Sequence, residues 1–167
     1  MLELFLLRHG QAEELGRNND KTDFDRKLTE EGIEKITRVG IFFNNLGEKT
    51  DLFLVSPYIR AKETAEVFLN CLELKPPSEV VDFLACGSSS AEIARGLSKY
   101  IKYESVILVG HCPDLEVLLC KLIGAENITL KKGSMAKITL NNGIELSGSL
   151  EWLITPKLVK KIKSKKS

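Results

Sequence analysis

Short apolar runs alternate along the chain with longer segments in which apolar residues recur every three or four positions. Four runs have the length and composition of strands buried on both faces of a parallel sheet. They cover residues 2–8, 52–56, 79–84 and 105–110. The intervening segments have helical spacing and cover residues 28–47, 60–72, 89–101 and 113–124. This alternation predicts an α/β fold, a three-layer αβα arrangement with a mainly parallel central sheet.

Residues at the segment boundaries support these helices. Thr29 is the expected N-cap of the first helix, and Gly47 is its expected C-terminal stop. Ser89 and Glu92 have the spacing of a capping box before the third helix. Pro113 is expected as the first residue of the fourth helix, since proline is favoured there.

The C-terminal part departs from the alternation. The segments SMAKITL (134–140) and IELSGSLEWLIT (144–155), joined by the turn NNG, predict a strand pair and therefore a late antiparallel strand. We see no internal repeat and no domain boundary before the stretch KLVKKIKSKKS. We therefore predict one domain over residues 1–156, followed by a Lys-rich tail over residues 157–167 that is solvated and partly disordered.

Composition narrows the class of protein. The 167 residues, 43% of them hydrophobic, suit one soluble globular domain. The formal net charge is +1, and without the six lysines of the tail the body has 18 basic and 23 acidic residues. This balance predicts neither a nucleic acid nor a membrane as partner. Four cysteines without a C-x-x-C pair, and no leader-like or membrane-spanning run, favour a cytoplasmic protein with free thiols.

The chain has two histidines, and both directly follow predicted strands. His9, preceded by Arg8, follows the first strand, and His111 follows the fourth. Arg60 lies just beyond the second strand. Because ligands bind at the carboxyl ends of strands in open α/β sheets, we expect these four residues to share one edge of the sheet.

These residues allow several kinds of site. Either histidine alone could be an ordinary core or surface residue, and two histidines with carboxylates could bind zinc. The adjacent arginines oppose a metal cation, however, and planar guanidinium groups suit phosphate. The cluster therefore predicts an anion pocket in which a neutral imidazole attacks phosphorus and fixed cations stabilise the transition state. We expect no metal ion and no cofactor.

Four motifs lie at the edges of the predicted elements: LLRHG (6–10), LTEEG (28–32), VSPYIRAKET (55–64) and VGHCPDL (109–115). Together and in this order, they resemble the histidine phosphatase superfamily, also called the phosphoglycerate mutase-like family. The resemblance covers about residues 1–160 and implies a hydrolase with a phosphoglycerate mutase-like fold. The short loops leave no room for a large cap insertion, which makes the chain similar to the small phosphohistidine phosphatases of this family.

The resemblance assigns roles to individual residues. His9 is implied as the nucleophile that becomes phosphorylated, and Arg8, Arg60 and His111 complete the catalytic set. Gly10 is implied to allow close backbone approach. The implied substrate-binding residues are Arg8, Arg60, His111, Gly10 and Ser56.

The general acid that many family members use is not evident. Phe83 stands where a glutamate would protonate the leaving oxygen, and Cys112 stands where acid phosphatases have an aspartate. Asp114 also fits a charge favoured at a helix N-terminus. The carboxylates that stay unresolved as acids are Asp114, Asp82, Glu13 and Glu14. A missing acid favours hydrolysis of a labile N–P bond over hydrolysis of an ester.

The sequence thus predicts a phosphatase that dephosphorylates a histidine-phosphorylated phosphotransfer or carrier protein through a covalent phosphohistidine intermediate. We expect an open rim that a protein substrate can reach; the oligomeric state is not indicated. Two alternatives stay open, a small-molecule phosphomonoesterase of the same superfamily and a phosphoprotein-binding module without turnover. A phosphoenzyme trapped on His9 would exclude the module.

Overall fold

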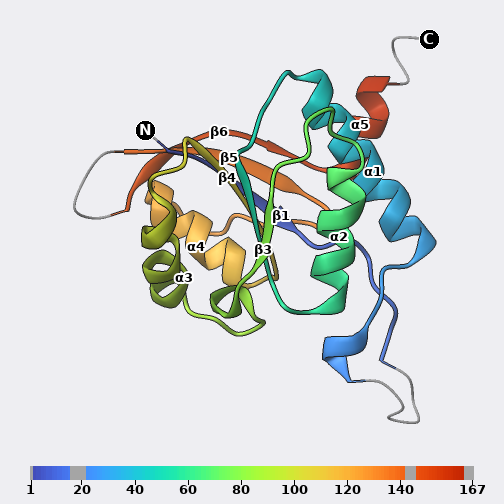
Figure 1. Cartoon of the computed structure of the whole chain (residues 1–167), viewed down its shortest axis with the longest axis horizontal. Coiled ribbons are helices and arrows are strands. Elements are labelled where there is room, and N and C mark those ends of the chain that lie inside the picture. The colour runs from blue at the N-terminus through green and yellow to red at the C-terminus, as the bar shows by residue number, and fades with distance from the viewer. Residues whose placement is uncertain (1, 16–21, 142–145, 164–167) are drawn as a thin grey trace.

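Six strands form one mixed sheet in the computed structural model, which describes residues 2–15, 22–141 and 146–163 (Figure 1). The strands are β1 (Leu2–Arg8), β2 (Leu52–Val55), β3 (Ser78–Val80), β4 (Ser105–Gly110), β5 (Met135–Leu140) and β6 (Gly148–Ile154). Their order is β3-β2-β4-β1-β5-β6; the first four are parallel, and β5 is antiparallel to both neighbours. The predicted mainly parallel sheet with a late antiparallel strand is confirmed.

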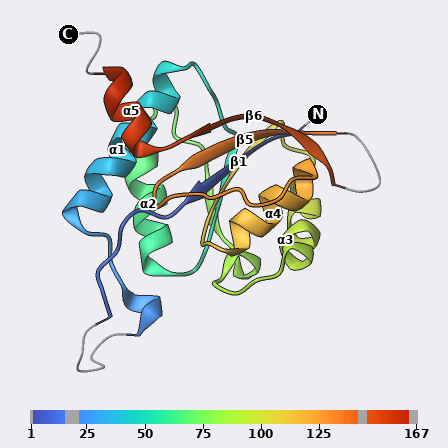
Figure 2. The same cartoon turned by 180° about the vertical axis from the view of Figure 1, so that it is seen from behind.

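Helices cover both faces of this sheet. They are α1 (Glu30–Asn45), α2 (Ile59–Leu69), α3 (Ser90–Leu97), α4 (Asp114–Ile123) and α5 (Pro156–Lys163), with short 3-10 turns η1 (Asp23–Asp25), η2 (Asp82–Leu84) and η3 (Ser98–Tyr100). Helices α1, α2 and α5 lie on one side and α3 and α4 on the other (Figures 1 and 2). This confirms the three-layer αβα arrangement.

Alternation along β1 divides the core into two layers. Leu4 and Leu6 pack with α3 and α4, whereas Phe5 and Leu7 pack with α1, α2 and α5. All four side chains are fully buried. A central strand of a covered sheet buries both of its faces, and successive side chains point to opposite layers.

The helix starts follow the predicted signals, whereas α2 and α3 end earlier than predicted, at Leu69 and Leu97. Thr29 Oγ1 accepts a hydrogen bond from the Gly32 N–H at 3.1 Å, so Thr29 is the N-cap of α1. Gly47, with φ of 75°, follows the end of that helix. The predicted capping box before α3 is present. Helix α4 begins one residue later than predicted, at Asp114.

The strand predicted over residues 79–84 is wrong beyond Val80. β3 is exposed at the edge of the sheet, and residues 82–84 form η2 instead. Val81 and Leu84 are buried around this turn. The run is apolar because a turn contributes side chains to the core. Composition alone does not distinguish such a turn from a strand.

Residues 157–163, predicted as part of a solvated and partly disordered tail, are helical. These residues belong to α5, which packs against α1, and Val159 is fully buried. The lysines are compatible with this helix because its buried side needs few apolar residues. Residues 164–167, and most of the predicted NNG turn, lie outside the described residues.

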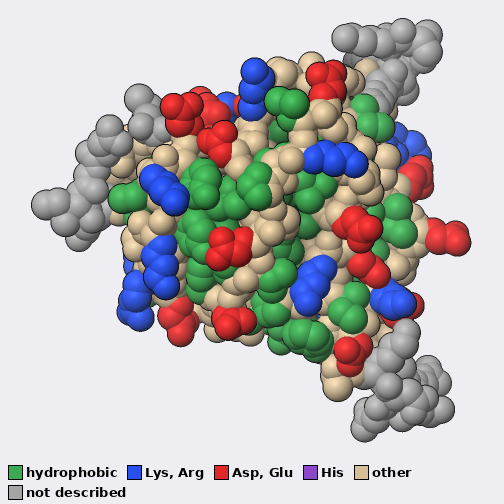
Figure 3. Space-filling view, in the orientation of Figure 1, with side chains coloured by type: hydrophobic (Ala, Val, Ile, Leu, Met, Phe, Trp, Pro, Cys, Tyr) green, Lys and Arg blue, Asp and Glu red, His purple; other side chains and the backbone are tan. Residues whose placement is uncertain are grey.

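The surface carries charges of both signs. On the face in Figure 3, acidic and basic side chains are interspersed around an apolar centre. No helix within the described ranges is long and apolar enough to cross a membrane. Cys86, Cys112 and Cys120 are free thiols.

Candidate active site

Three neighbouring parallel strands, β2, β4 and β1, bring the predicted residues to one edge of the sheet. Arg8 ends β1 and His9 follows it; His111 directly follows β4. Arg60 lies in the first turn of α2, shortly after β2. The His9 and His111 rings are 5.1 Å apart between centroids, and Arg60 Nε lies 3.3 Å from His9 Nε2. The structure thus brings His9, Arg60 and His111 together, as predicted.

The two ring nitrogens of His9 have different partners, and Nε2 accepts a hydrogen bond from Arg60 Nε–H at 3.3 Å. Its Nδ1 lies 2.7 Å from the Gly10 carbonyl oxygen. A carbonyl only accepts, so Nδ1 carries the proton and Nε2 keeps its lone pair. Burial, with smaller contributions from His111, Arg60 and Arg8, lowers the pKa of His9 to about 3, although the hydrogen bond to the Gly10 carbonyl acts in the opposite direction. The imidazole is therefore neutral at physiological pH and can act as a nucleophile.

His111 is almost completely buried beside it. Burial, followed by the charge of Arg60, lowers the pKa of His111 to about 4. Its Nε2 lies 2.7 Å from Ser56 Oγ, and its ring meets the Tyr58 ring edge-on at 4.9 Å. Ser56 itself is fully buried. The structure therefore places the Ser56 hydroxyl against His111.

Arg60 has a partner that the sequence did not indicate. Its Nη1 donates to the Asp23 carbonyl oxygen at 2.5 Å, and its Nη2 donates to Asp23 Oδ2 at 3.0 Å. Asp23 Oδ1 pairs with Arg26 at 2.8 Å. Burial raises the pKa of Asp23, but hydrogen bonds from Arg26 and Arg60 more than offset this and hold it below its ordinary value. Asp23 is thus an anion that fixes a buried guanidinium.

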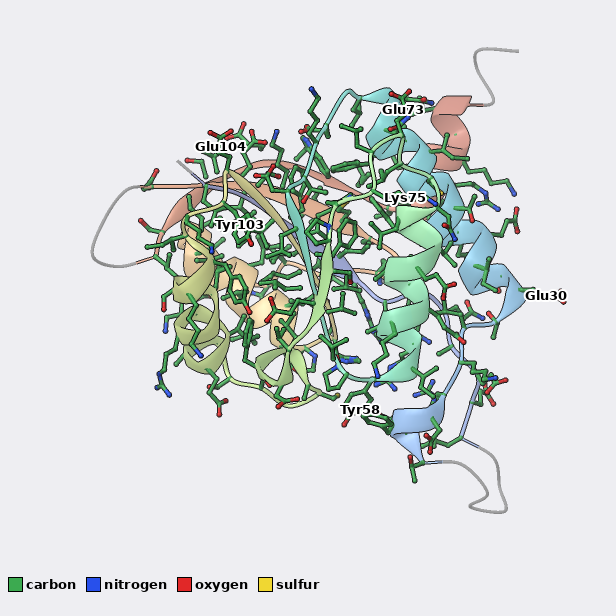
Figure 4. All side chains as sticks on the ribbon, in the orientation of Figure 1. Glu30, Tyr58, Glu73, Lys75, Tyr103 and Glu104 are labelled. Atoms are coloured by element: carbon green, nitrogen blue, oxygen red, sulfur yellow. The ribbon has the colours of Figure 1, made fainter. Side chains whose placement is uncertain are left out.

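The turn η1 packs on the site through its aromatic residue as well. The Phe24 and Tyr58 rings lie 4.9 Å apart, and Figure 4 shows Tyr58 beside this turn. The Arg60 guanidinium lies over the Tyr58 ring at 4.8 Å. The expected open rim is therefore bordered on this side by residues 23–25. Residues 16–21 lie outside the described residues.

Gly10 permits a close approach to α1. A Cβ at this position would lie 3.0 Å from Ile36 Cγ1 and 3.2 Å from the Gly32 carbonyl oxygen. The Gly10 N–H donates to Thr64 Oγ1 at 3.1 Å, and this hydroxyl donates to the Arg60 carbonyl oxygen at 2.6 Å. Buried Thr64 therefore links the segment after His9 to α2, a connection that the motif pattern alone did not reveal.

Three buried polar atoms lack a hydrogen-bond partner in the described part of the chain. They are Arg8 Nε, His111 Nδ1 and Ser134 Oγ. Arg8 Nη1 is engaged with the Leu130 carbonyl oxygen at 2.6 Å, and the Arg8 N–H donates to the Ser134 carbonyl oxygen at 3.1 Å. All three atoms belong to residues at one end of the sheet. Buried donors without acceptors are costly, and an oxyanion would provide acceptors.

The candidate acids have other surroundings. Asp114 accepts a hydrogen bond from the Gly87 N–H at 2.7 Å, and Glu13 Oε2 lies 3.5 Å from the Lys27 N–H. Asp82 and Glu14 are exposed. Burial raises the pKa of the Cys112 thiol to about 12, so it stays protonated. Among the described residues, no group of three or more His, Cys, Asp or Glu side chains is placed to hold a metal ion.

Two buried histidines and two arginines thus lie at the carboxyl edge of this αβα sheet, and the chain belongs to the histidine phosphatase superfamily. The sequence profile of branch 1 of this superfamily matches residues 4–85. The chain is accordingly a phosphatase, and hence a hydrolase.

Particular relatives span most of the chain. The phosphohistidine phosphatase SixA of Escherichia coli (strain K12) is 25% identical over 163 residues, which are 93% of this chain and 94% of that protein. An uncharacterised protein of Picosynechococcus is 34% identical over 116 residues, 68% of each chain. The solved structure of the protein histidine phosphatase SixA complexed with tungstate has a TM-score of 0.84 and 24% identity, covering 93% of this chain and 98% of that one.

Proposed function

We propose that this protein is a phosphohistidine phosphatase that acts on histidine-phosphorylated phosphotransfer or carrier proteins. The observation that carries the proposal is the state of His9: a neutral ring whose Nδ1–H is bound to the Gly10 carbonyl and whose Nε2 faces a buried arginine. Similarity to SixA over nearly the whole chain supports the substrate class. The partner protein is to be found by experiment.

The proposed reaction has two displacements at phosphorus. The His9 Nε2 lone pair forms a P–N bond while the P–N bond to the substrate imidazole breaks; that imidazole keeps the electron pair and takes a proton from solvent. Water then attacks the phosphorus on His9, which releases phosphate and a proton and restores Nε2. Arg8, Arg60 and His111 hold the phosphoryl oxygens and stabilise the charge of both transition states.

The surroundings of the carboxylates support N–P hydrolysis rather than ester hydrolysis. Asp114 is engaged by the Gly87 N–H, and Asp23 is kept ionised by two arginines. An ionised carboxylate cannot donate a proton to an alkoxide, and general acid catalysis contributes about 10²–10⁴-fold to such reactions. The substrate imidazole takes its proton from solvent on its other ring nitrogen and leaves as a neutral ring, so it needs no acid from the protein. The site therefore suits a substrate with a good leaving group.

The test compares phosphate release from a phosphohistidine-bearing phosphotransfer domain with release from phosphoserine and other phosphomonoesters. We expect fast release from the first and slow release from the esters. His9→Gln should lower release by roughly 10³-fold or more, because the nucleophile is gone. Leu74→Ser, at an exposed position far from the motifs, is the control and should match the wild type.

Two results would contradict the proposal. Efficient turnover of a phosphomonoester, with slow turnover of the phosphohistidine protein, would indicate a small-molecule phosphatase. Release that survives in His9→Gln would exclude the covalent route. The intermediate is checked directly by rapid quench and mass spectrometry, which should find an acid-labile phosphoryl group on the peptide that contains His9.

A further inference from the structure

The contact between Ser56 and His111 determines more than the position of the ring. A neutral imidazole carries its proton on one nitrogen, and the other nitrogen is an acceptor. The pKa of His111 is lowered to about 4, so its ring is neutral at physiological pH and has two possible tautomers. One tautomer carries its N–H at Nδ1, and the other has a lone pair there.

The hydrogen bonds of Ser56 distinguish these tautomers. The Tyr58 N–H approaches Ser56 Oγ at 3.4 Å, a long contact in which the oxygen accepts. The hydroxyl proton then needs an acceptor of its own, and His111 Nε2 at 2.7 Å provides one. If Nε2 carried the proton instead, Ser56 Oγ would accept hydrogen bonds from both His111 and the Tyr58 N–H. The proton of the Ser56 hydroxyl would then be buried without His111 Nε2 as its acceptor. Buried polar hydrogens are rarely left in that state.

The remaining nitrogen of the His111 ring is therefore a donor. Nδ1 is buried and has no hydrogen-bond partner in the described part of the chain. The ring to which it belongs lies 5.1 Å from the His9 ring, centroid to centroid. A donor suits the oxygens of a phosphoryl group on His9, whereas a lone pair would repel them.

We propose that Ser56 is a positioning residue that fixes His111 as the Nδ1–H tautomer, so that Nδ1–H donates to the phosphoryl group. The role in phosphoryl transfer rests on the proposed function. Ser56 is suited to this task because it is fully buried and its own N–H donates to the Val109 carbonyl oxygen at 3.0 Å. The serine is thus held against β4, two residues before His111, and its hydroxyl orients the ring from behind.

The tautomer can be measured directly, because the chain has only two histidines. In protein labelled with ¹⁵N-histidine, long-range ¹H–¹⁵N spectra at neutral pH distinguish protonated from unprotonated ring nitrogens. His111→Gln assigns the signals. We expect the protonated shift at Nδ1 and the unprotonated shift at Nε2 of His111 in the wild type. Ser56→Ala should convert the signals to the Nε2–H form or to an average of both, while the His9 signals keep their positions.

Tungstate affinity provides the second readout, since tungstate is an oxyanion that can occupy a phosphoryl site. We expect Ser56→Ala to weaken tungstate binding roughly tenfold, the scale of one hydrogen bond to a charged group. Ser56→Thr keeps the hydroxyl and should restore both the tautomer and the affinity. If Ser56 only supported the fold, Ser56→Ala and Ser56→Thr would change the stability of the protein but leave the tautomer of His111 unchanged.

Three outcomes separate the possibilities. A wild-type His111 with its proton on Nε2 overturns the inference. So does a Ser56→Ala variant that retains both the Nδ1–H signals and the wild-type tungstate affinity. If the tautomer and the loss of affinity are as expected but phosphohistidine proteins are not hydrolysed, the role of Ser56 in oxyanion binding stands and the proposed substrate class fails.

Discussion

Burial makes both histidines neutral and ties protein stability to their protonation. His9 and His111 have 7% and 2% of their surface exposed, and their pKa values are lowered from 6.5 to about 3 and about 4. The unfolded chain therefore binds more protons than the folded protein between roughly pH 6.5 and pH 3. Because excess protons on the unfolded state favour unfolding, the free energy of unfolding falls as the pH falls through this window.

Denaturant unfolding at pH 7.5 and pH 5 tests this. We expect each histidine to lower the free energy of unfolding of the wild type by on the order of 2 kcal/mol between the two pH values. His9→Gln removes one titrating group, so its free energy of unfolding should decrease by about 2 kcal/mol less than that of the wild type. Parallel pH dependences for the two proteins would show that His9 is not held neutral in the folded state.

At the residue scale, the sequence identified the groups at strand ends but not their supports. His9, Arg60 and His111 follow apolar strands, and strand topology brings such positions together. Asp23 and Thr64 support them through contacts between segments distant in sequence. The course of the loop before Leu28 has no periodicity from which the Asp23 contact could have been predicted. The roles of Arg8, Gly10 and Ser56 in substrate binding remain predictions.

At the element scale, η1 is a short turn with a specific contact to the active site. Its first residue holds Arg60 by two hydrogen bonds, and its second packs on Tyr58. The fixed guanidinium keeps its Nε–H on His9, but the carboxylate also places a negative charge near the site of an anionic substrate. The turn therefore orients Arg60, while its carboxylate opposes the binding of an anion at the proposed site.

Asp23→Asn separates these two effects. With the charge removed, phosphoryl groups should bind more tightly, which lowers KM several-fold, while a less firmly held Arg60 lowers kcat roughly tenfold. Steady-state kinetics on a phosphohistidine protein measures both. The matched control is Asp25→Asn in the same turn, whose carboxylate accepts a hydrogen bond from Thr22. Equal effects of the two variants would mean that the general charge of the turn, rather than the contact with Arg60, is responsible.

Two element predictions failed for related reasons. Residues 81–84 are mostly apolar like a strand, but residues 82–84 form the turn η2, and Val81 and Leu84 are buried around it. Residues 157–163 are lysine-rich like a solvated tail but form a helix with a narrow apolar side. In both places tertiary packing decides the structure, and composition within a short window does not report packing.

At the scale of the whole molecule, α5 completes the layer formed by α1 and α2. Its Val159 is fully buried in the same cluster as Phe5 and Phe43, whereas Leu158 is 45% exposed. The Lys-rich C-terminal region therefore contributes to the stability of the domain. Lys157, Lys160 and Lys161 of this helix are exposed.

Val159→Ala should lower the free energy of unfolding by about 2 kcal/mol, since it removes two buried carbons and leaves a cavity. Leu158→Ala, one residue earlier and exposed, should change it by less than about 0.5 kcal/mol. Thermal or denaturant unfolding compares the two. If both substitutions have the same small effect, α5 does not pack on the domain in solution.

Side chains alternate along β1, so Arg8 and His9, which follow one another at the carboxyl edge of the sheet, continue opposite faces of the strand while both lie near the candidate site. Arg8 continues the face of Leu4 and Leu6 and meets Leu130, whereas His9 continues the face of Phe5 and Leu7 and meets Arg60 of α2. Inserting or deleting a single residue within β1 would exchange these faces, because side chains alternate with a period of two. Connecting loops elsewhere can lengthen during evolution without this effect. In related proteins, insertions and deletions should therefore occur before or after β1 rather than within it.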